Sequence, residues 1–283
     1  MKFIGVIASM GLLNVAAAGS GEVEPSCTEP PTIVPTPTVN PTPTATPTPS
    51  DSSASSASSD SSASSDSSDS SGKSSFARFF DQDRFHEVFP DAVELYNFNG
   101  LVDAADKYTA FANTGDDASD KRELAAFLAQ TAHESDSYKA AQEYGWENYP
   151  VDEYCNSTFY PCASGQRYHG RGPIQLSWNY NYYLAGDALD LDLLNNPDIV
   201  ATDTTVTWMT ALWYWMTPRD GRVIHDVVTG EDGFAESTKI INGGLECGPD
   251  APNKANEQQR IEYFTKMCEA LDVEPLGKTS CNA

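Results

Sequence analysis

The clearest pattern of hydrophobic and polar positions lies at residues 119–135, SDKRELAAFLAQTAHES. Asp120 and Glu123 resemble a capping box, which marks the start of a helix. The apolar positions that follow have the spacing i, i+3, i+4 and i+7 of an amphipathic helix: Leu124, Phe127, Leu128 and Thr131. The pattern therefore predicts a helix that buries one face and ends near His133 and Glu134.

Further helices are predicted on both sides of this segment. Residues 80–89 and 101–111 carry apolar side chains at helical spacing, and another helix is expected at 256–271. Residues 204–217 (TTVTWMTALWYWMT) are apolar almost all round, which predicts a buried helix. The Gly- and Asn-rich segments between them are typical of loops and short strands. We expect one mainly α-helical domain with a minor β part.

The first quarter of the chain has a different composition. Lys2, the apolar run from Phe3 to Val15 and the small residues 16–19 are typical of a secretory signal peptide. Residues 28–75 alternate Pro with Thr and then repeat Ser, Ala and Asp, with too few apolar side chains to fold. We therefore expect a signal peptide at 1–19, a disordered linker at 20–75 and a folded domain at 76–283. The linker is either a glycosylated spacer or a passive connection.

Charge and hydropathy restrict the partners. The formal net charge is -24, so phosphate backbones are repelled and a nucleic acid partner is not expected. The acidic surface suits a neutral or partly cationic polymer, or serves only solubility. After the first 19 residues no stretch stays apolar for 18 residues, so we expect an exported protein without a membrane partner.

The cysteines and histidines do not predict a metal site. Six cysteines allow fifteen pairings, and Cys27 lies in the linker region, so three bridges within the domain are not expected. No Cys-x-x-Cys occurs, and the four histidines lack ligand spacing. We expect no metal and no cofactor.

Three carboxylates are candidates for acid–base chemistry. Glu134 lies at the C-terminal end of its predicted helix, where the helix dipole and partial burial raise a carboxyl pKa. The local pattern alone nevertheless favours a solvated surface residue. Glu143 follows nine residues later, with Glu147 close by. Glycosidases need two carboxylates with different tasks, but two acids at this spacing are common by chance.

Residues 168–183, YHGRGPIQLSWNYNYY, are more informative. Amides and hydroxyls hydrogen-bond sugar hydroxyl and N-acetyl groups, and aromatic rings pack on sugar faces. The alternative is a polar surface loop with buried tyrosines. The density of amide and aromatic residues favours a sugar-binding segment.

This segment and five others resemble the signature runs of glycoside hydrolase family 19 chitinases. The others are AAFLAQTAHES, DLLNNPDIVATD, ALWYWMT, INGGLECG and QRIEYF, in the same order along the chain. The resemblance implies a lysozyme-like, mainly helical domain with a deep substrate cleft. It implies endo-acting hydrolysis of β-1,4-linked N-acetylglucosamine polymers with inversion at the anomeric carbon.

The resemblance also implies roles for single residues. Glu134 resembles the general acid, Glu143 the general base, and Ser177 the hydroxyl that holds the attacking water. Gln175, Tyr180, Asn181 and Asn242 match substrate-contacting positions, and His133 and Arg260 match supporting residues. We expect Arg260 to keep one carboxylate ionised, whereas the general acid lacks such help. Glu147 is the alternative base.

The same resemblance implies which cysteines form disulfides. It implies a bridge between Cys155 and Cys162 and another between Cys247 and Cys281, which leaves Cys268 free and buried and Cys27 without a partner in the domain. Asn156 opens a glycosylation sequon inside the smaller loop.

Some positions depart from the family pattern. The gap between Glu134 and Glu143 is short, Trp178 stands where a histidine is common, and His169 stands where a tyrosine is common. We expect a more open cleft with fewer sugar subsites, in a secreted monomer, either free or wall-associated, that binds chitin or chitooligosaccharides. The alternatives are a peptidoglycan hydrolase of the same fold and a non-catalytic wall-binding protein.

Overall fold

A computed structural model describes residues 75–282. The predicted signal peptide, almost all of the predicted linker, and Cys27 lie outside the described residues. The described part contains eight α-helices and four short 3₁₀ helices. The α-helices are α1 Gln82–Val88, α2 Phe98–Ala105, α3 Asp117–Glu134, α4 Asn179–Leu189, α5 Thr204–Met216, α6 Ile224–Val228, α7 Gly233–Glu246 and α8 Lys254–Leu271. The 3₁₀ helices are η1 Ser75–Arg78, η2 Glu94–Tyr96, η3 Trp146–Asn148 and η4 Pro197–Ala201.

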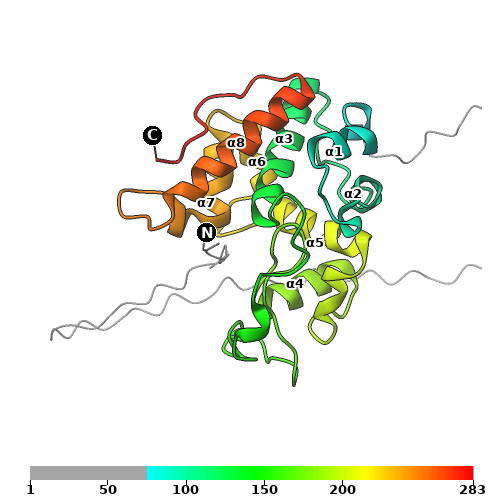
Figure 1. The fold of residues 1–283 in the computed structure, drawn as a ribbon, viewed down its shortest axis with the longest axis vertical. Coiled ribbons are helices and arrows are strands. Elements are labelled where there is room, and N and C mark those ends of the chain that lie inside the picture. Colours follow the sequence, from blue (N-terminus) through cyan, green and yellow to red (C-terminus); the bar gives the residue numbers. More distant parts are fainter. Residues whose placement is uncertain (1–74, 283) are drawn as a thin grey trace, which may run out of the picture. The chain divides into compact units, whose positions relative to one another are not determined.

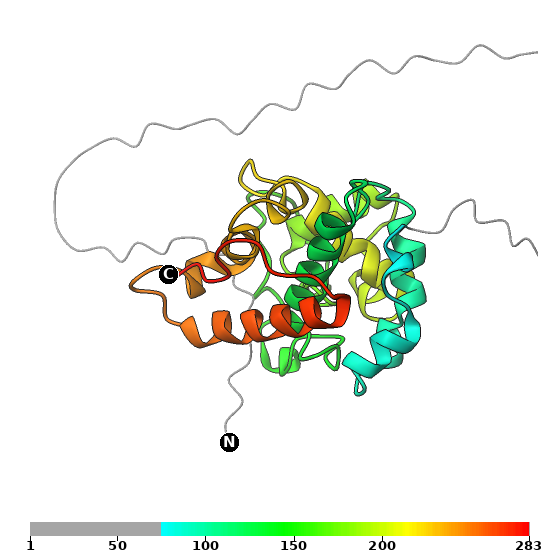
Figure 2. The same cartoon turned by 90° about the horizontal axis from the view of Figure 1, so that it is seen from above.

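Helix α3 is the central element, and its residues from Glu123 to Glu134 are all buried. Helix α8 packs along it, with α1 and α2 at one end of the domain and α7 at the other (Figures 1 and 2). The all-round apolar helix is α5, which is buried as predicted. Its Trp215 meets Phe127 of α3 edge to face, with ring centroids 5.3 Å apart. This contact packs the middle of α3 against α5, and Glu134 lies at the C-terminal end of the same helix.

Side-chain caps define where the helices begin. Asp116 caps α3 by accepting a hydrogen bond from the Ser119 backbone N–H at 2.8 Å, and Asp203 caps α5 in the same way. The predicted capping box was wrong, because Asp120 and Glu123 are buried inside α3. Asp120 instead binds the Thr114 backbone and Arg78. Both acids therefore hold tertiary contacts and do not cap the helix.

The mainly helical fold is confirmed, and the predicted helix at 256–271 lies within α8. The helix predicted at 101–111 was too long at its C-terminal end, because α2 ends at Ala105. Within residues 75–282 the minor β part consists of isolated bridges, among them Gln142 with Arg171 and Arg171 with Leu176. The short strands expected between the helices are thus single pairings, and two of them lie beside the candidate site.

Both inferred disulfides are present, Cys155–Cys162 and Cys247–Cys281, and Cys268 is free and buried as expected. The second bridge joins the end of α7 to the C-terminal segment. Among the described residues, none of the helices combines the length and apolar character needed to cross a bilayer.

Candidate active site

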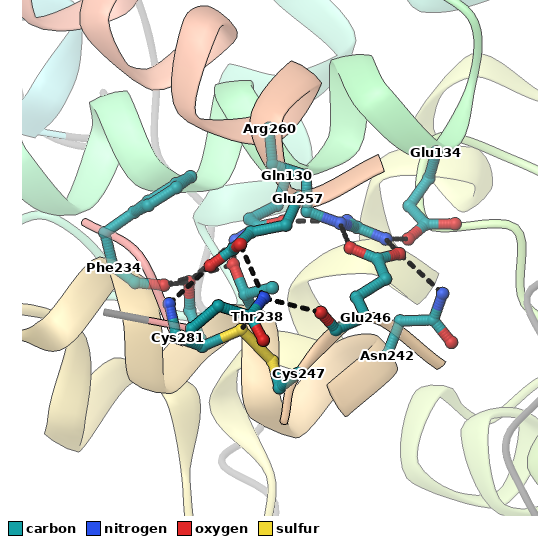
Figure 3. Close-up of polar contacts among 12 residues, drawn as sticks. Gln130, Glu134, Phe234, Thr238, Asn242, Glu246, Cys247, Glu257, Arg260 and Cys281 are labelled. Atoms are coloured by element: carbon teal, nitrogen blue, oxygen red, sulfur yellow. Dashed lines mark hydrogen bonds and ion pairs between the residues drawn. A yellow bond between two sulfur atoms is a disulfide. The ribbon is translucent and has the colours of Figure 1, made fainter. Parts of the chain in front are cut away.

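A buried hydrogen-bond network surrounds Glu134 (Figure 3). Arg260 of α8 donates from Nη2 to Glu134 and to Glu246 Oε1, and from Nε to Glu246 Oε2 at 2.7 Å. Its Nη1 donates to Gln130 Oε1 at 2.8 Å. Asn242 donates to Glu246 Oε1 at 2.6 Å, next to the kink that its own non-helical backbone makes in α7. One guanidinium thus joins helices α3, α7 and α8.

The environment of Glu134 changes two expectations. Its side chain is fully buried, so the solvated surface interpretation was wrong. The expectation that the acid lacks an arginine was also wrong, because Arg260 contacts Glu134 directly. Burial raises the pKa of Glu134 above its ordinary value, the charge and hydrogen bond of Arg260 oppose this rise, and Glu246 adds to it. A carboxyl with a raised pKa holds a proton that it can donate.

The chain reverses directly after Glu134. Asp136, Ser137 and Tyr138 have φ values of 51°, 58° and 63°, in the left-handed region that side chains rarely occupy. Tyr138 anchors this turn, because its buried hydroxyl donates to the Leu128 carbonyl at 2.9 Å and contacts Thr131. Such backbone conformations persist only where surrounding contacts determine them. The short gap between Glu134 and Glu143 is therefore a fixed turn.

Glu143 lies at the end of this turn, paired with residues 170–172. Its backbone N–H donates to the Gly170 carbonyl at 2.8 Å. Its carboxylate accepts from the Tyr154 hydroxyl at 2.9 Å and from the Gly170 N–H at 3.2 Å. Glu143 is buried, 6% exposed, whereas Glu147 in η3 is exposed. Fixed hydrogen bonds hold Glu143 in place, which favours it over Glu147 as the second functional carboxylate.

The polar segment predicted to bind sugar is largely buried at residues 168–177, not a polar surface loop. Its loop depends on Gly172, whose φ of 71° favours glycine and whose Cα packs toward Thr207 of α5. Ser177 donates to the Gln175 carbonyl at 2.9 Å, and Asn181 donates to the Ser177 carbonyl at 2.9 Å. These bonds order the segment that faces Glu134.

Four of the residues singled out in the sequence line one pocket. Its walls are Glu134, Ile174, Gln175, Leu176, Ser177, Asn181, Tyr214 and Ile241. Arg260 contacts the pocket through Glu134, and Asn242 is linked to Arg260 through Glu246. Ser177 is therefore positioned to share a small space with the candidate acid.

Glu143 and Tyr180 are not among the residues that line the pocket. A row of aromatic rings connects them instead. Tyr154 binds Glu143 and packs edge to face on Trp178, 5.5 Å between centroids, and Trp178 stacks with Tyr180 at 6.0 Å. Trp178 takes a positive φ of 74° at the N-terminus of α4. Tyr180 thus lies at the far end of a chain of contacts that begins at Glu143.

Two histidines near the site are buried and neutral. Burial, followed by the charge of Arg260, holds the pKa of His133 well below its ordinary value. Burial beside Arg171 and Arg167 lowers the pKa of His169 to about 3. His169 stacks on Trp146 at 4.5 Å and its Nε2 hydrogen-bonds Gln142 Oε1 at 2.9 Å. Neither ring carries a charge near neutral pH.

Sequence reasoning missed four residues of this region: Gln130, Tyr154, Tyr214 and Glu246. Glu246 stands in the INGGLECG run and Tyr214 in ALWYWMT, but nothing in the spacing shows that their side chains reach the site. Within residues 75–282 no group of three or more His, Cys, Asp or Glu side chains is arranged to hold a metal ion.

Comparison of the chain with known proteins identifies its family. The family described as chitinase class I matches residues 72–281. The chain belongs to the family 19 chitinases. Among relatives of this chain, an endochitinase of Pisum sativum is 40% identical over 211 residues, which are 66% of this chain and 65% of the relative. Basic endochitinase B of Arabidopsis thaliana is also 40% identical, over 66% of this chain and 62% of its own length. The chain thus spans slightly less than two thirds of these relatives.

Solved chitinase structures match the described fold more completely. A bacterial family 19 chitinase has 42% identity and a TM-score of 0.65, and the match covers 71% of this chain and 98% of that one. Chitinase C from Streptomyces griseus HUT6037 has 41% identity and a TM-score of 0.65 over 71% and 96% of the two chains. These family 19 structures have the lysozyme-like, mainly helical fold that the sequence predicted.

Proposed function

We propose that this protein is an endo-acting chitinase that hydrolyses β-1,4 linkages of N-acetylglucosamine polymers with inversion at the anomeric carbon. Membership of the family 19 chitinases supports the substrate class. The site supports the reaction type, because it offers one carboxyl with a raised pKa, Glu134, and a second carboxylate, Glu143, held by two hydrogen bonds. The single observation that carries the proposal is the buried Glu134 at the wall of a pocket shared with Ser177.

In the proposed reaction Glu134 protonates the glycosidic oxygen as the bond to the anomeric carbon breaks. Glu143 takes a proton from a water molecule that attacks that carbon from the opposite face, and Ser177 positions this water. Inverting enzymes need their two carboxyls roughly 6.5–9.5 Å apart to leave room for the water. After each turnover Glu134 regains its proton from solvent and Glu143 loses one. No group other than side chains and water takes part in these steps.

The remaining site residues either hold the two carboxylates in place or bind the substrate. Arg260 positions Glu134 by a hydrogen bond, the buried neutral ring of His133 supports the same end of α3, and Asn242 orders the network through Glu246. Gln175 and Asn181 bind sugar residues from the wall of the pocket, and Tyr180, which lies outside the pocket, binds the polymer beside it. The rows of amide and aromatic groups on α4 and the preceding loop fit a neutral polysaccharide.

Proton NMR of chitohexaose hydrolysis tests this proposal. The purified wild-type protein is expected to release the α-anomer first, before mutarotation. Prompt β-anomer would refute inversion, and absence of cleavage would refute the chitinase activity.

We further propose that the chain is secreted as a monomer, with a signal peptide at 1–19, a linker at 20–75 and the catalytic domain at 76–283. The signal pattern and the two disulfides support an oxidising route. The sequon at Asn156 lies in the small disulfide loop and would be glycosylated on that route. Cleavage after the small residues 16–19 is checked by sequencing the N-terminus of the exported protein.

A further inference from the structure

The turn between Glu134 and Glu143 consists of two halves that are bound to different parts of the molecule. Residues 135–140 are bound to the end of α3, because the Ser137 N–H donates to the Ala132 carbonyl at 2.7 Å. Helix α3 ends at Glu134, so this half directly continues the element that carries the proposed acid. The first half of the turn therefore keeps its place relative to Glu134.

Residues 141–143 are bound instead to the loop that precedes α4. The Ala141 carbonyl accepts from the Gly172 N–H at 3.0 Å, and the Glu143 N–H donates to the Gly170 carbonyl at 2.8 Å. This second half carries the proposed base and keeps its place relative to that loop. The distance between the two carboxyl groups thus depends on how the two halves of the turn are held together.

A side-chain hydrogen bond joins the two halves. Tyr144 directly follows the proposed base, and Asp136 lies two residues after the proposed acid. The Tyr144 hydroxyl donates to Asp136 Oδ2 at 3.0 Å, and Asp136 Oδ1 lies 3.3 Å from Lys139 Nζ, within the first half. Partial burial, followed by the hydrogen bond to Asp136, raises the pKa of Tyr144, so the phenol stays protonated and can donate. The bond therefore closes the turn next to both carboxyl groups.

The place of this bond indicates what it does. Both side chains are exposed, so the bond contributes little to the stability of the fold. Inverting hydrolysis needs two carboxyls at a separation that admits one water, and a small misplacement of a catalytic group costs a large factor in rate. We propose that Tyr144 and Asp136 are positioning residues, whose hydrogen bond sets the separation of Glu134 and Glu143. This inference rests on the proposed function and on that catalytic pair.

Tyr144→Phe tests the proposal, because the change removes the hydroxyl and keeps the ring. Hydrolysis of chitohexaose is measured for this variant and wild type. We expect kcat to fall about fivefold, the size of one hydrogen bond, with KM unchanged. The Tm is expected to stay near that of wild type, since an exposed side chain is changed.

Two changes at Asp136 separate the hydrogen bond from other effects. Asn and Gly both tolerate the φ of 51° at this position, but only Asn keeps an oxygen that accepts from Tyr144. Asp136→Asn should therefore retain the wild-type kcat, whereas Asp136→Gly should lose about as much as Tyr144→Phe. Adding Tyr144→Phe to Asp136→Gly should cause no further loss. Lys139→Met is the matched control, because it removes the other partner of Asp136 and should leave kcat unchanged.

Three results would overturn the positioning role. One is a wild-type kcat in Tyr144→Phe. Another is a further fivefold loss when Tyr144→Phe is added to Asp136→Gly, because the hydroxyl would then act on a different group. The third is a rise in KM at constant kcat, or a Tm that falls together with kcat, which would assign Tyr144 to sugar binding or to stability. A wild-type protein that does not cleave chitohexaose would instead refute the proposed function, so the two failures are distinguishable.

Discussion

Glu134 and Glu246 accept hydrogen bonds from the same buried guanidinium, that of Arg260. Two acids therefore share one positive charge, and all three side chains are buried. Burial raises the pKa of Glu134, and Glu246 adds to this rise, so the pKa stays above its ordinary value although Arg260 contacts Glu134 directly. Glu246, which the sequence patterns did not single out, thereby becomes a control on the proton that Glu134 donates.

Replacing Glu246 tests this control. Glu246→Gln removes a negative charge that raises the pKa of Glu134, so that pKa falls. Because the acid must be protonated to act, kcat falls as pH rises through its pKa, and the alkaline limb of the pH–rate profile moves to lower pH in the variant. Glu236→Gln serves as control, since Glu236 pairs with Arg222 and Lys239 at the surface. An alkaline limb at the same pH in Glu246→Gln and wild type would contradict the account.

Arg260 should matter to stability as well as to chemistry. Arg260→Met leaves two buried carboxylates without their cation, and breaking such a buried pair costs about 3–5 kcal/mol. Arg222→Met breaks the exposed pair with Glu236 and should cost about 0–1 kcal/mol. Urea unfolding of both variants measures the difference. Equal losses would show that the buried network does not stabilise the fold.

The contact between His225 and Glu123 should make the free energy of unfolding depend on pH. Its Nδ1 contacts the buried Glu123 Oε1 at 2.6 Å, and that hydrogen bond raises the pKa of His225. A raised folded pKa gives stability that is fully present below the unfolded value of about 6.5 and is lost as pH rises through the folded value. His225→Gln should therefore lose stability most at low pH and flatten this dependence.

Unfolding free energies between about pH 5 and pH 9, a range that spans the unfolded histidine pKa, measure it. His86→Gln changes an exposed histidine and should keep the wild-type curve. If His225→Gln had a curve parallel to wild type across this range, the ion pair with Glu123 would not be the cause.

The two disulfides should differ in their contributions. Cys247–Cys281 closes a separation of 34 residues and Cys155–Cys162 one of seven, so the chain-entropy estimate is about 4 kcal/mol for the first and about 2 kcal/mol for the second. The buried Glu257 also binds the C-terminal segment, through Ser280 and Asn282. Paired Cys→Ser variants compared by urea unfolding check the order. A larger loss from the shorter loop would contradict it.

The helices were predictable because apolar spacing at α3, α5 and α8 reflects burial in a single core. The roles of Asp120 and Glu123 were not predictable, since the sequence shows a cap-like pattern but not that backbone N–H groups of the loop before α3 donate to both carboxylates. Arg260 is a clearer example of a residue whose contacts the sequence does not predict. Motifs identified it as a supporting residue, yet which carboxylates it reaches depends on how α8 packs along α3 and α7. The place of Tyr214 on the pocket wall is likewise a property of packing alone.

The central claim is that Glu134 and Glu143 form the catalytic pair. The most direct measurement is chitohexaose hydrolysis by wild type, Glu134→Gln, Glu143→Gln and Glu147→Gln, with correct folding of each confirmed by its Tm. The account predicts that Glu134→Gln and Glu143→Gln each lose at least about a hundredfold in kcat, the lower end of the range for losing a general acid or base. Glu147→Gln, which changes an exposed side chain, should keep wild-type kcat. Activity retained in Glu143→Gln but lost in Glu147→Gln would contradict the assigned pair.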